Sequence, residues 1–350
     1  MSRQVIIPLI LLAAGLAAIG FHMQKNSQGL KQSAVDPRIV LAFAEWTSSQ
    51  RKVYANPTDK NFRLGVFAKN FMTIEAHNSN PRKTWTMGLT TFADLTSEEF
   101  LAKTNQKSGL RAEMEVSGMP SEVSGTSGLT QQAGINWMTY LQQQVITGSN
   151  GCNDNYAWIS AVTMNAQSTI RRGSYSPAFS PQTYIDCSAN FGNYGCNGGT
   201  AANSYTYSYN WGIDTMSNYP YYGTQRPCRA ATGYYKNSGA YAVTSQSNTD
   251  LYNRLSTKNV ITAAIDISGA QFYRGGVFTG PCTTTVNQGV IITGAGFDSS
   301  SNLNFWLLLN TWGPGWGENG TMRIARFTVD NNPSYSSCGL NMFANFPYYN

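Results

Sequence analysis

The chain has 350 residues, of which 41% are hydrophobic, so it is long enough to bury a large core and a smaller one. Charged residues make up only 12% of it, and the net charge is +6. This composition excludes a disordered or fibrous chain, and without a dense run of Lys or Arg it argues against a nucleic-acid-binding protein.

The first predicted element is an apolar segment from Val5 to Phe21, which follows Arg3 and ends in small residues. It is short for a membrane-spanning helix, and small residues before a polar stretch are typical of a cleavage site. We interpret residues 1–21 as a secretory signal peptide, cleaved near Gly20. The alternative is an uncleaved membrane anchor. In either case the folded part enters an oxidising compartment, either extracellular or lysosome- or vacuole-like.

Residues 35–105 are predicted to form a small helical domain. Residues recur at helical spacing from Asp59 to Asn78, which predicts one amphipathic helix. A second helix is predicted to start at Ser97, because acidic residues follow it directly. Residues 106–133 are rich in Gly, Ser, Thr and Met, and we interpret them as a linker.

Residues 134–350 form the remaining predicted domain, and its first half is helical. The first helix is expected from about Asp154 to Arg172, where Asn153 or Asp154 caps the N-terminal amides and Gly173 ends the helix. Two shorter helices are predicted near 181–187 and 201–209.

The second half of this domain is predicted to be rich in strands. Several segments contain β-branched or alternating apolar residues, and the strands are expected at 243–245, 260–267, 290–297, 305–310 and 322–327. Asn319-Gly320 is a dipeptide typical of hairpin turns. Helices followed by strands predict an α+β fold in two lobes.

Six cysteines lie in this domain, and their even number in a secreted chain predicts disulfides, with fifteen pairings open. The only two histidines, His22 and His77, lie in the first quarter of the chain. Any catalytic group in residues 134–350 must therefore come from another residue type.

Spaced motifs run through residues 134–350. The most specific run is Trp306 to Asn310, followed by Trp312-Gly313 and Gly315–Gly320, and further motifs are Ile135-Asn136-Trp137, Asp186-Cys187 and Cys196-Asn197-Gly198-Gly199. Together they resemble the papain family of cysteine peptidases. The resemblance implies a helical left lobe and a β-sheet or barrel right lobe. It also implies the disulfides Cys152–Cys196, Cys187–Cys228 and Cys282–Cys338.

Residues 35–105 resemble the family's inhibitory propeptide, the I29 type. Its E-R-F-N-I-N helix pattern is matched, with Asp in place of Glu, by Asp59, Arg63, Phe67, Asn70, Ile74 and Asn78. Its G-x-N-x-F-x-D pattern is matched by Gly88, Phe92 and Asp94, with Thr90 in place of Asn. The resemblance implies that this helical domain caps the cleft and that its tail runs backward through it, so the chain's own propeptide is an expected partner.

The resemblance places the family's reactive groups at positions that have lost them. The nucleophile motif is C-G-S-C-W-A-F, and in the corresponding segment, Cys152–Trp158, Asn155 replaces the nucleophilic cysteine. The base histidine is expected directly after Val286-Asn287, where Gln288 stands. An amide does not attack a carbonyl as a thiolate does, and it does not accept a proton near neutral pH.

Other positions agree with this loss. Ser149 stands where the oxyanion-hole glutamine is implied, three residues before Cys152, and its hydroxyl is too short to replace that donor. Asn310 is retained, and we expect its amide to hydrogen-bond Gln288. Asp154 is expected to cap a helix rather than to act as a base. No metal site or cofactor is predicted, because the cysteines are expected to be oxidised and carboxylates do not cluster.

Residues that line the family's cleft are partly retained. Gly198 and Gly199 resemble the edge that hydrogen-bonds substrate backbone by strand addition, and Trp312 is expected to wall the far side with Trp316. The alternative is that the glycines permit a tight turn and the tryptophans pack inside the fold. Asn319-Gly320-Thr321 is also a glycosylation sequon, although the predicted turn explains its Asn-Gly.

The favoured interpretation is an inactive papain-like peptidase homologue that binds peptide or protein in or around the old cleft. A second is a structural, disulfide-bonded component of an extracellular or organelle assembly. A third is a cysteine-type peptidase of unusual mechanism. No nucleic-acid partner is expected, and a membrane is expected only if the N-terminal segment is an uncleaved anchor.

Overall fold

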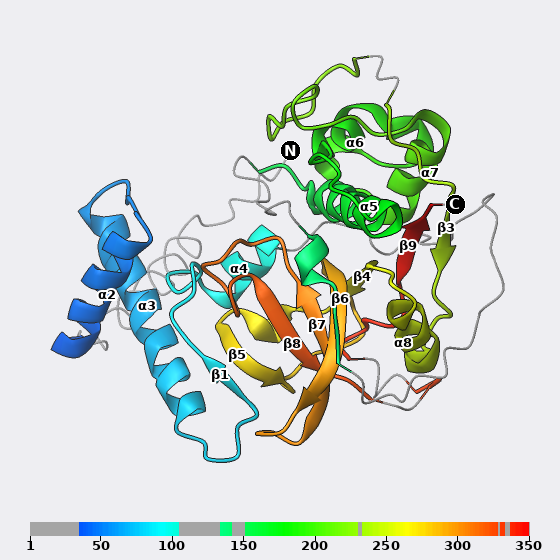
Figure 1. Cartoon of the computed structure of the whole chain (residues 1–350). Helices are drawn as coiled ribbons and strands as arrows, with labels where there is room; N and C mark the ends of the chain where they lie inside the picture. The colour runs from blue at the N-terminus through cyan, green and yellow to red at the C-terminus, as the bar shows by residue number, and fades with distance from the viewer. Residues whose placement is uncertain are drawn as a thin grey trace, which may run out of the picture. The chain divides into compact units, whose positions relative to one another are not determined.

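The computed structural model describes residues 35–104, 134–141, 151–229, 233–327, 330–332 and 337–349 (Figure 1). The chain divides into two compact units after Ala68. The predicted signal peptide at 1–21, the predicted linker at 106–133 and Ser149 lie outside the described residues. In the part of the chain that is described, no helix combines the length and apolar character needed to cross a membrane.

The first unit contains helix α2 (Pro37–Ser49) and the start of α3 (Pro57–Asn78). Asp36 caps α2 by accepting a hydrogen bond from the Arg38 amide, and Pro37 stands at a position where its missing N–H costs nothing. Phe43 and Trp46 of α2 pack against Phe67 of α3, with ring centroids 5.1 and 5.3 Å away. Helix α2 is not predicted from the sequence, whereas α3 confirms the predicted amphipathic helix.

The second unit contains a nine-stranded sheet. Its strands are β1 (Trp85–Met87), β2 (Ile135–Asn136), β3 (Gly239–Ala242), β4 (Ile261–Ile265), β5 (Tyr273–Phe278), β6 (Gln288–Asp298), β7 (Leu303–Leu309), β8 (Thr321–Ala325) and β9 (Asn345–Tyr348). The order is β1-β5-β8-β7-β6-β4-β9-β3, and β2 pairs with β6. Adjacent strands are antiparallel except β5 and β8.

Four of the five predicted strands are confirmed, by β4, β6, β7 and β8. The predicted strand at 243–245 is wrong, because β3 ends at Ala242. The backbone N–H of Thr244 donates to the Asp250 carboxylate at 2.8 Å, so this segment turns toward helix α8 (Asn248–Ser256) instead of extending the strand.

Helices dominate the other part of the second unit. They are α5 (Asn155–Arg172), α6 (Pro181–Cys187) and α7 (Ala201–Trp211). The unit also contains α4 (Ser97–Thr104), whose Phe100 belongs to the buried cluster of the sheet, and short 3₁₀ turns at Met138–Tyr140, Ala189–Phe191, Gly195–Asn197 and Ser268–Ala270. The predicted helix start at Ser97 and the predicted helix end at Gly173 are confirmed. Figure 1 shows α5, α6 and α7 grouped together beside the strands.

Two buried clusters make this part of the chain two-lobed, as predicted. One cluster lies within the sheet and includes Phe278, Trp306 and Trp316. The other surrounds α5 and includes Trp158 and Tyr184. The helical cluster and the sheet cluster correspond to the predicted left and right lobes of an α+β fold.

Disulfides and one turn fix the loops around these lobes. The three disulfides are Cys152–Cys196, Cys187–Cys228 and Cys282–Cys338, the same pairing that the family resemblance implies. Asn319 and Gly320 have φ values of 54° and 87°, and Glu318 and Thr321 pair on either side of them. Positive φ at both central residues is typical of a type I′ hairpin turn, so the predicted turn is confirmed.

Candidate functional site

Asn155 is the first residue of α5, and its side chain reaches across to the other lobe. Its amide nitrogen donates to the Gly289 carbonyl at 3.1 Å and to the Thr311 hydroxyl oxygen at 2.8 Å. The residue is 3% exposed, and its Oδ1 has no hydrogen-bond partner among the described residues. The electron pair on a carboxamide nitrogen is delocalised into the amide carbonyl, so Asn155 has no reactive pair with which to attack a substrate carbonyl.

Gln288 begins β6 and shares the same acceptors. Its Nε2 donates to Asn310 Oδ1 at 2.9 Å, to the Gly289 carbonyl at 3.2 Å and to the Thr311 hydroxyl oxygen at 3.3 Å. The expected hydrogen bond between the Gln288 and Asn310 amides is therefore confirmed. The structure brings Asn155, Gln288 and Asn310 into one buried network, and none of these amides titrates near neutral pH.

Thr311 and Gly289 are members of this network that sequence reasoning missed. Each directly follows a residue that was identified, Asn310 and Gln288 respectively. The Thr311 backbone N–H also donates to Asn310 Oδ1 at 2.8 Å, which fixes the orientation of that amide. Adjacency to the identified pair is the sequence signal that would have found both residues.

Asp154 occupies the N-cap position of α5, but its side chain makes no capping hydrogen bond, so the predicted cap is wrong. Its ψ of 11° is not the extended conformation from which a cap side chain reaches the helix amides. Oδ2 instead accepts the Tyr221 hydroxyl at 2.5 Å. Burial, followed by the hydrogen bond to Asp154, raises the pKa of Tyr221, so the phenol keeps its proton and remains a donor.

Gly198 and Gly199 lie in a tight turn before α7, and both are buried. Gly198 has a φ of 107°, and its carbonyl accepts the Tyr194 amide at 2.8 Å. A Cβ at Gly199 would lie 2.3 Å from Asn193 Oδ1. Turn geometry and close packing therefore already require glycine at these positions, and their role in peptide binding stays a prediction.

Trp312 and Trp316 have different environments. Trp316 is fully buried, and its indole donates to the Ala270 carbonyl at 2.9 Å, so it belongs to the core of the sheet lobe. Trp312 is partly buried, and the edges of Phe92 and Phe100 meet it at centroid distances of 5.2 and 5.5 Å. Trp312 is thus already in contact with an N-terminal segment of the same chain.

That segment, residues 84–100, docks on the sheet lobe by backbone pairing. Strand β1 adds antiparallel to β5, and the Gly88 amide donates to the Phe272 carbonyl at 2.9 Å. Gln271 Nε2 donates to the Phe92 carbonyl at 3.1 Å and the Leu95 carbonyl at 2.9 Å, while the Thr90 hydroxyl donates to the Gln271 carbonyl at 2.9 Å. The strand β1 is thus bound by backbone pairing, and the turn after it is bound through its carbonyl groups.

Helix α3 supports the docked segment from its other side. Asn70 Nδ2 donates to the carbonyls of Ala93 and Leu95, each at 2.9 Å. Asn78 Nδ2 donates to the Met87 carbonyl at 2.8 Å, and Asn78 Oδ1 accepts the Met87 amide at 3.0 Å. Asn78 therefore holds strand β1, and Asn70 holds the turn that follows it.

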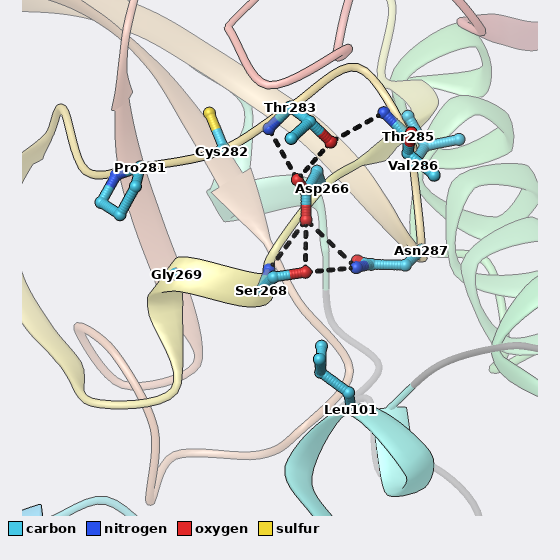
Figure 2. A pocket seen from close by; sticks show the side chains of 10 residues that line it. All are labelled: Leu101, Asp266, Ser268, Gly269, Pro281, Cys282, Thr283, Thr285, Val286 and Asn287. Atoms are coloured by element: carbon cyan, nitrogen blue, oxygen red, sulfur yellow. Dashed lines mark hydrogen bonds between the residues drawn. The ribbon is translucent and has the colours of Figure 1, made fainter. Parts of the chain in front are cut away.

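A pocket of about 600 Å³ lies between α4 and the loop that contains Cys282. Figure 2 shows Leu101 on one side of it and a network centred on Asp266 on the other. The Asp266 carboxylate accepts hydrogen bonds from backbone and hydroxyl groups of Ser268 and Thr283 and from Asn287. Burial raises the pKa of Asp266, but these hydrogen bonds outweigh it, and the net pKa is lowered.

Within the ranges that the structure describes, no group of three or more His, Cys, Asp or Glu residues could hold a metal ion.

Comparison with known proteins finds a family match for residues 43–100 and another for residues 134–348. Residues 134–348 match the model for "Papain family cysteine protease", and residues 43–100 match the "Cathepsin propeptide inhibitor domain (I29)". The chain is 32% identical over 331 residues to fruit bromelain from Ananas comosus, covering 89% of this chain and 87% of bromelain. It is 31% identical over 319 residues to papain from Carica papaya, with coverages of 89% and 88%.

Solved structures give the same result. Digestive procathepsin L 3 from the larval midgut of Tenebrio molitor superposes with a TM-score of 0.77 at 26% identity, over 89% of this chain and all of that one. The recombinant stem bromelain precursor superposes with a TM-score of 0.75 at 27% identity, over 90% and 99% of the two chains. Both coverages extend over the propeptide-like part as well as the two lobes.

Proposed function

The chain belongs to the papain family of cysteine proteases and carries the family's propeptide inhibitor domain, and we propose that it is a member that binds polypeptide without cleaving it. The observation that carries the proposal is the Asn155 side chain. It stands at the first position of α5, where the family resemblance puts the nucleophile, and it donates its amide hydrogens to the opposite lobe.

Loss of cleavage follows from the chemistry of both replaced groups. A thiolate attacks the carbonyl in this family's mechanism, and a histidine removes and returns the proton. Asn155 and Gln288 supply neither function, and losing nucleophile and base together costs on the order of 10⁶ in rate in comparable hydrolases. That factor corresponds to roughly 8 kcal/mol of activation barrier.

Retention of binding is supported by the segment that already lies on the sheet lobe. Residues 84–100 use backbone pairing to β5, the Gln271 amide and the Trp312 ring. None of these contacts needs a reactive side chain. The chain's own propeptide is thus the first ligand of this surface, and a peptide or protein with a similar short strand, followed by a turn that carries aromatic side chains, is the class of partner that would replace it.

The compartment proposed for this activity is the secretory pathway, leading to an extracellular or lysosome- or vacuole-like space. Three disulfides occupy all six cysteines. Disulfides persist in oxidising compartments and are rare in the cytosol. The segment at 1–21 is proposed as the signal that directs the chain there.

One further observation favours a second candidate function, as a structural component of an assembly. Several large aromatic side chains of the helical lobe are exposed, including Tyr175 at 68%, Trp211 at 57% and Tyr234 at 83%. In that case the partner would associate through this surface and not through the cleft. Cross-linking followed by mass spectrometry distinguishes the two, because the cross-linked residues would lie in the helical lobe rather than near β5 and Trp312.

The test of the binding proposal uses a full-length chain with a site-specific protease sequence inserted in 106–133. After cutting, a labelled peptide covering residues 80–104 competes with the retained N-terminal fragment, and fluorescence anisotropy reports its binding. We expect saturable binding that Gln271→Ala weakens about tenfold or more, since two hydrogen bonds to the peptide backbone are lost. Binding that is absent, or that is insensitive to Gln271→Ala and to Trp312→Ala, would refute the proposal.

A further inference from the structure

Gly289 is a glycine that the local backbone does not require. It is the second residue of β6 and pairs with Ala264 of β4. It is not among the residues with positive φ, whereas Gly317 and Gly320 of the nearby loop are. An alanine at this point in a strand would be compatible with the backbone, so the reason for glycine lies in the surroundings.

The surroundings point to Asn155. A Cβ built on Gly289 would lie 2.2 Å from Asn155 Oδ1 and 2.8 Å from Ile159 Cδ1. The Ile159 methyl is the far end of a flexible side chain and can move. The Asn155 amide cannot, because its nitrogen is held by the Gly289 carbonyl and the Thr311 hydroxyl. Only the absence of a side chain at position 289 leaves room for Asn155 in this orientation.

These contacts also join the two lobes. Asn155 begins the helix that forms the helical core, while Gly289 and Thr311 belong to strand β6 and to the loop after β7. The hydrogen bonds are buried, and losing the donor would leave two buried acceptors with fewer partners. We infer that Asn155 is a strut between the lobes, with Gly289 as the residue that admits it, so that the position of the lost nucleophile has acquired a structural role.

This inference goes beyond the proposed binding function, because it concerns stability and does not depend on any ligand. It also predicts that Asn155 and Gly289 behave as one unit. Replacing Asn155 with alanine removes the strut, and replacing Gly289 with alanine keeps the strut but forces a methyl group against it. Once Asn155 is gone, a side chain at position 289 no longer meets the fixed amide.

The test is a thermal double-mutant cycle on the full-length chain, comparing Asn155→Ala, Gly289→Ala and the double variant. We expect Asn155→Ala to lower the melting temperature by about 3–8 °C. Gly289→Ala should lower it by a similar or larger amount through overpacking. The melting temperature of the double variant should be close to that of Asn155→Ala alone. It should lie several degrees above the value expected if the two losses were additive.

Two outcomes would overturn the inference: an unchanged melting temperature for Asn155→Ala, or additive losses in the double variant. If Gly289→Ala does not fold, recovery of folded protein on adding Asn155→Ala supports the coupling, and failure to recover contradicts it. The matched control combines Gly289→Ala with Ile159→Val, which removes only the flexible methyl group. This control should recover less folded protein, or less of the melting temperature, than the combination of Gly289→Ala with Asn155→Ala. Peptide binding is not measured, so this test and that of the binding proposal can fail independently.

Discussion

The buried amides of Asn155, Gln288 and Asn310 have consequences at the residue scale. Asn155, Gln288 and Asn310 form a network without a group that titrates near neutral pH. Such a network cannot hold the charged nucleophile–base pair on which the family's chemistry depends. Burying this neutral network costs less than burying an ion pair, since no charge has to be removed from water, although Asn155 Oδ1 is buried without a partner among the described residues.

Restoring the nucleophile alone should not restore catalysis. Asn155→Cys is expected to give almost no peptidase activity, because no base activates the thiol and the amide strut is lost. Adding Gln288→His and Ser149→Gln is expected to recover weak activity. The single and the triple variant are both measured by labelling with a thiol-directed active-site reagent and by turnover of a fluorogenic peptide. Ordinary turnover by Asn155→Cys alone would show that another residue serves as base.

Asp266 gives a pH-dependent prediction. Its folded-state pKa is lowered, so its contribution to stability is present above the unfolded value and is lost as the pH falls through the folded one. We expect Asp266→Asn to reduce the free energy of unfolding by about 1–3 kcal/mol at pH 7. The difference from the unmodified chain should shrink below about pH 4.

Urea unfolding at pH 7 and pH 3 checks this difference. Thr283→Ser is the matched control, since it keeps both the backbone and hydroxyl donors to Asp266. A constant difference between the two pH values would mean that the carboxylate charge contributes nothing through this network.

Part of the site could be predicted from single residues, and the reasons for the rest are local. The positions of Asn155, Gln288 and Asn310 follow from motifs that flank them. Asp154 was misinterpreted because the usual preference for an acidic N-cap takes no account of Tyr221, which is 67 residues away in sequence. Gly289 was missed because the clash that requires it is visible only in three dimensions.

At the scale of elements, the segment 84–100 is held by the pairing of β1 with β5, by side-chain hydrogen bonds and by several aromatic contacts. β1 has only three residues, so its backbone hydrogen bonds to β5 would by themselves hold the segment only weakly on the sheet lobe. Phe92 and Phe100 are both buried, and both rings meet Trp312. We infer that these two rings supply most of the affinity between the propeptide and the sheet lobe.

Phe92→Ala is therefore expected to weaken that association. Truncating a buried Phe costs about 3–5 kcal/mol, so after cutting within 106–133 the N-terminal fragment should dissociate at least 100-fold more readily. Size-exclusion chromatography across a dilution series measures it. Met72→Ala, at a residue that is 63% exposed, is the control and should leave the fragment bound. If Phe92→Ala and Met72→Ala kept the same fraction of the N-terminal fragment bound, the role inferred for the Phe92 ring would be contradicted.

The elements themselves were predictable where their patterns were regular. The strands β4, β6 and β7 are runs of apolar residues and are correctly placed. β5 contains Gly275 and Gly276, and β9 contains Pro347, so neither has a typical strand composition. These strands exist because neighbouring strands pair with them, which a local pattern does not show.

At the scale of the whole molecule, a propeptide inhibitor domain and a papain-family fold occur in one chain, and we propose that this chain lacks the family's reactive pair. Active family members can remove their propeptides, but the proposed chemistry does not allow this chain to do so. We expect purified protein to keep residues 35–105 attached at acidic pH unless another protease cuts within 106–133. Intact-mass measurement over time checks this, and self-cleavage of pure protein that resists protease inhibitors would contradict it.

The most direct test of the account is the hydrolysis of a fluorogenic dipeptide by purified chain whose propeptide has been cut off and removed. An ordinary peptidase would have a kcat/KM of about 10⁴–10⁸ M⁻¹s⁻¹. The account predicts a rate indistinguishable from that of a buffer blank, with Asn155→Ala giving the same reading. Hydrolysis at ordinary enzyme speed that co-purifies with the chain and disappears in Asn155→Ala would contradict it.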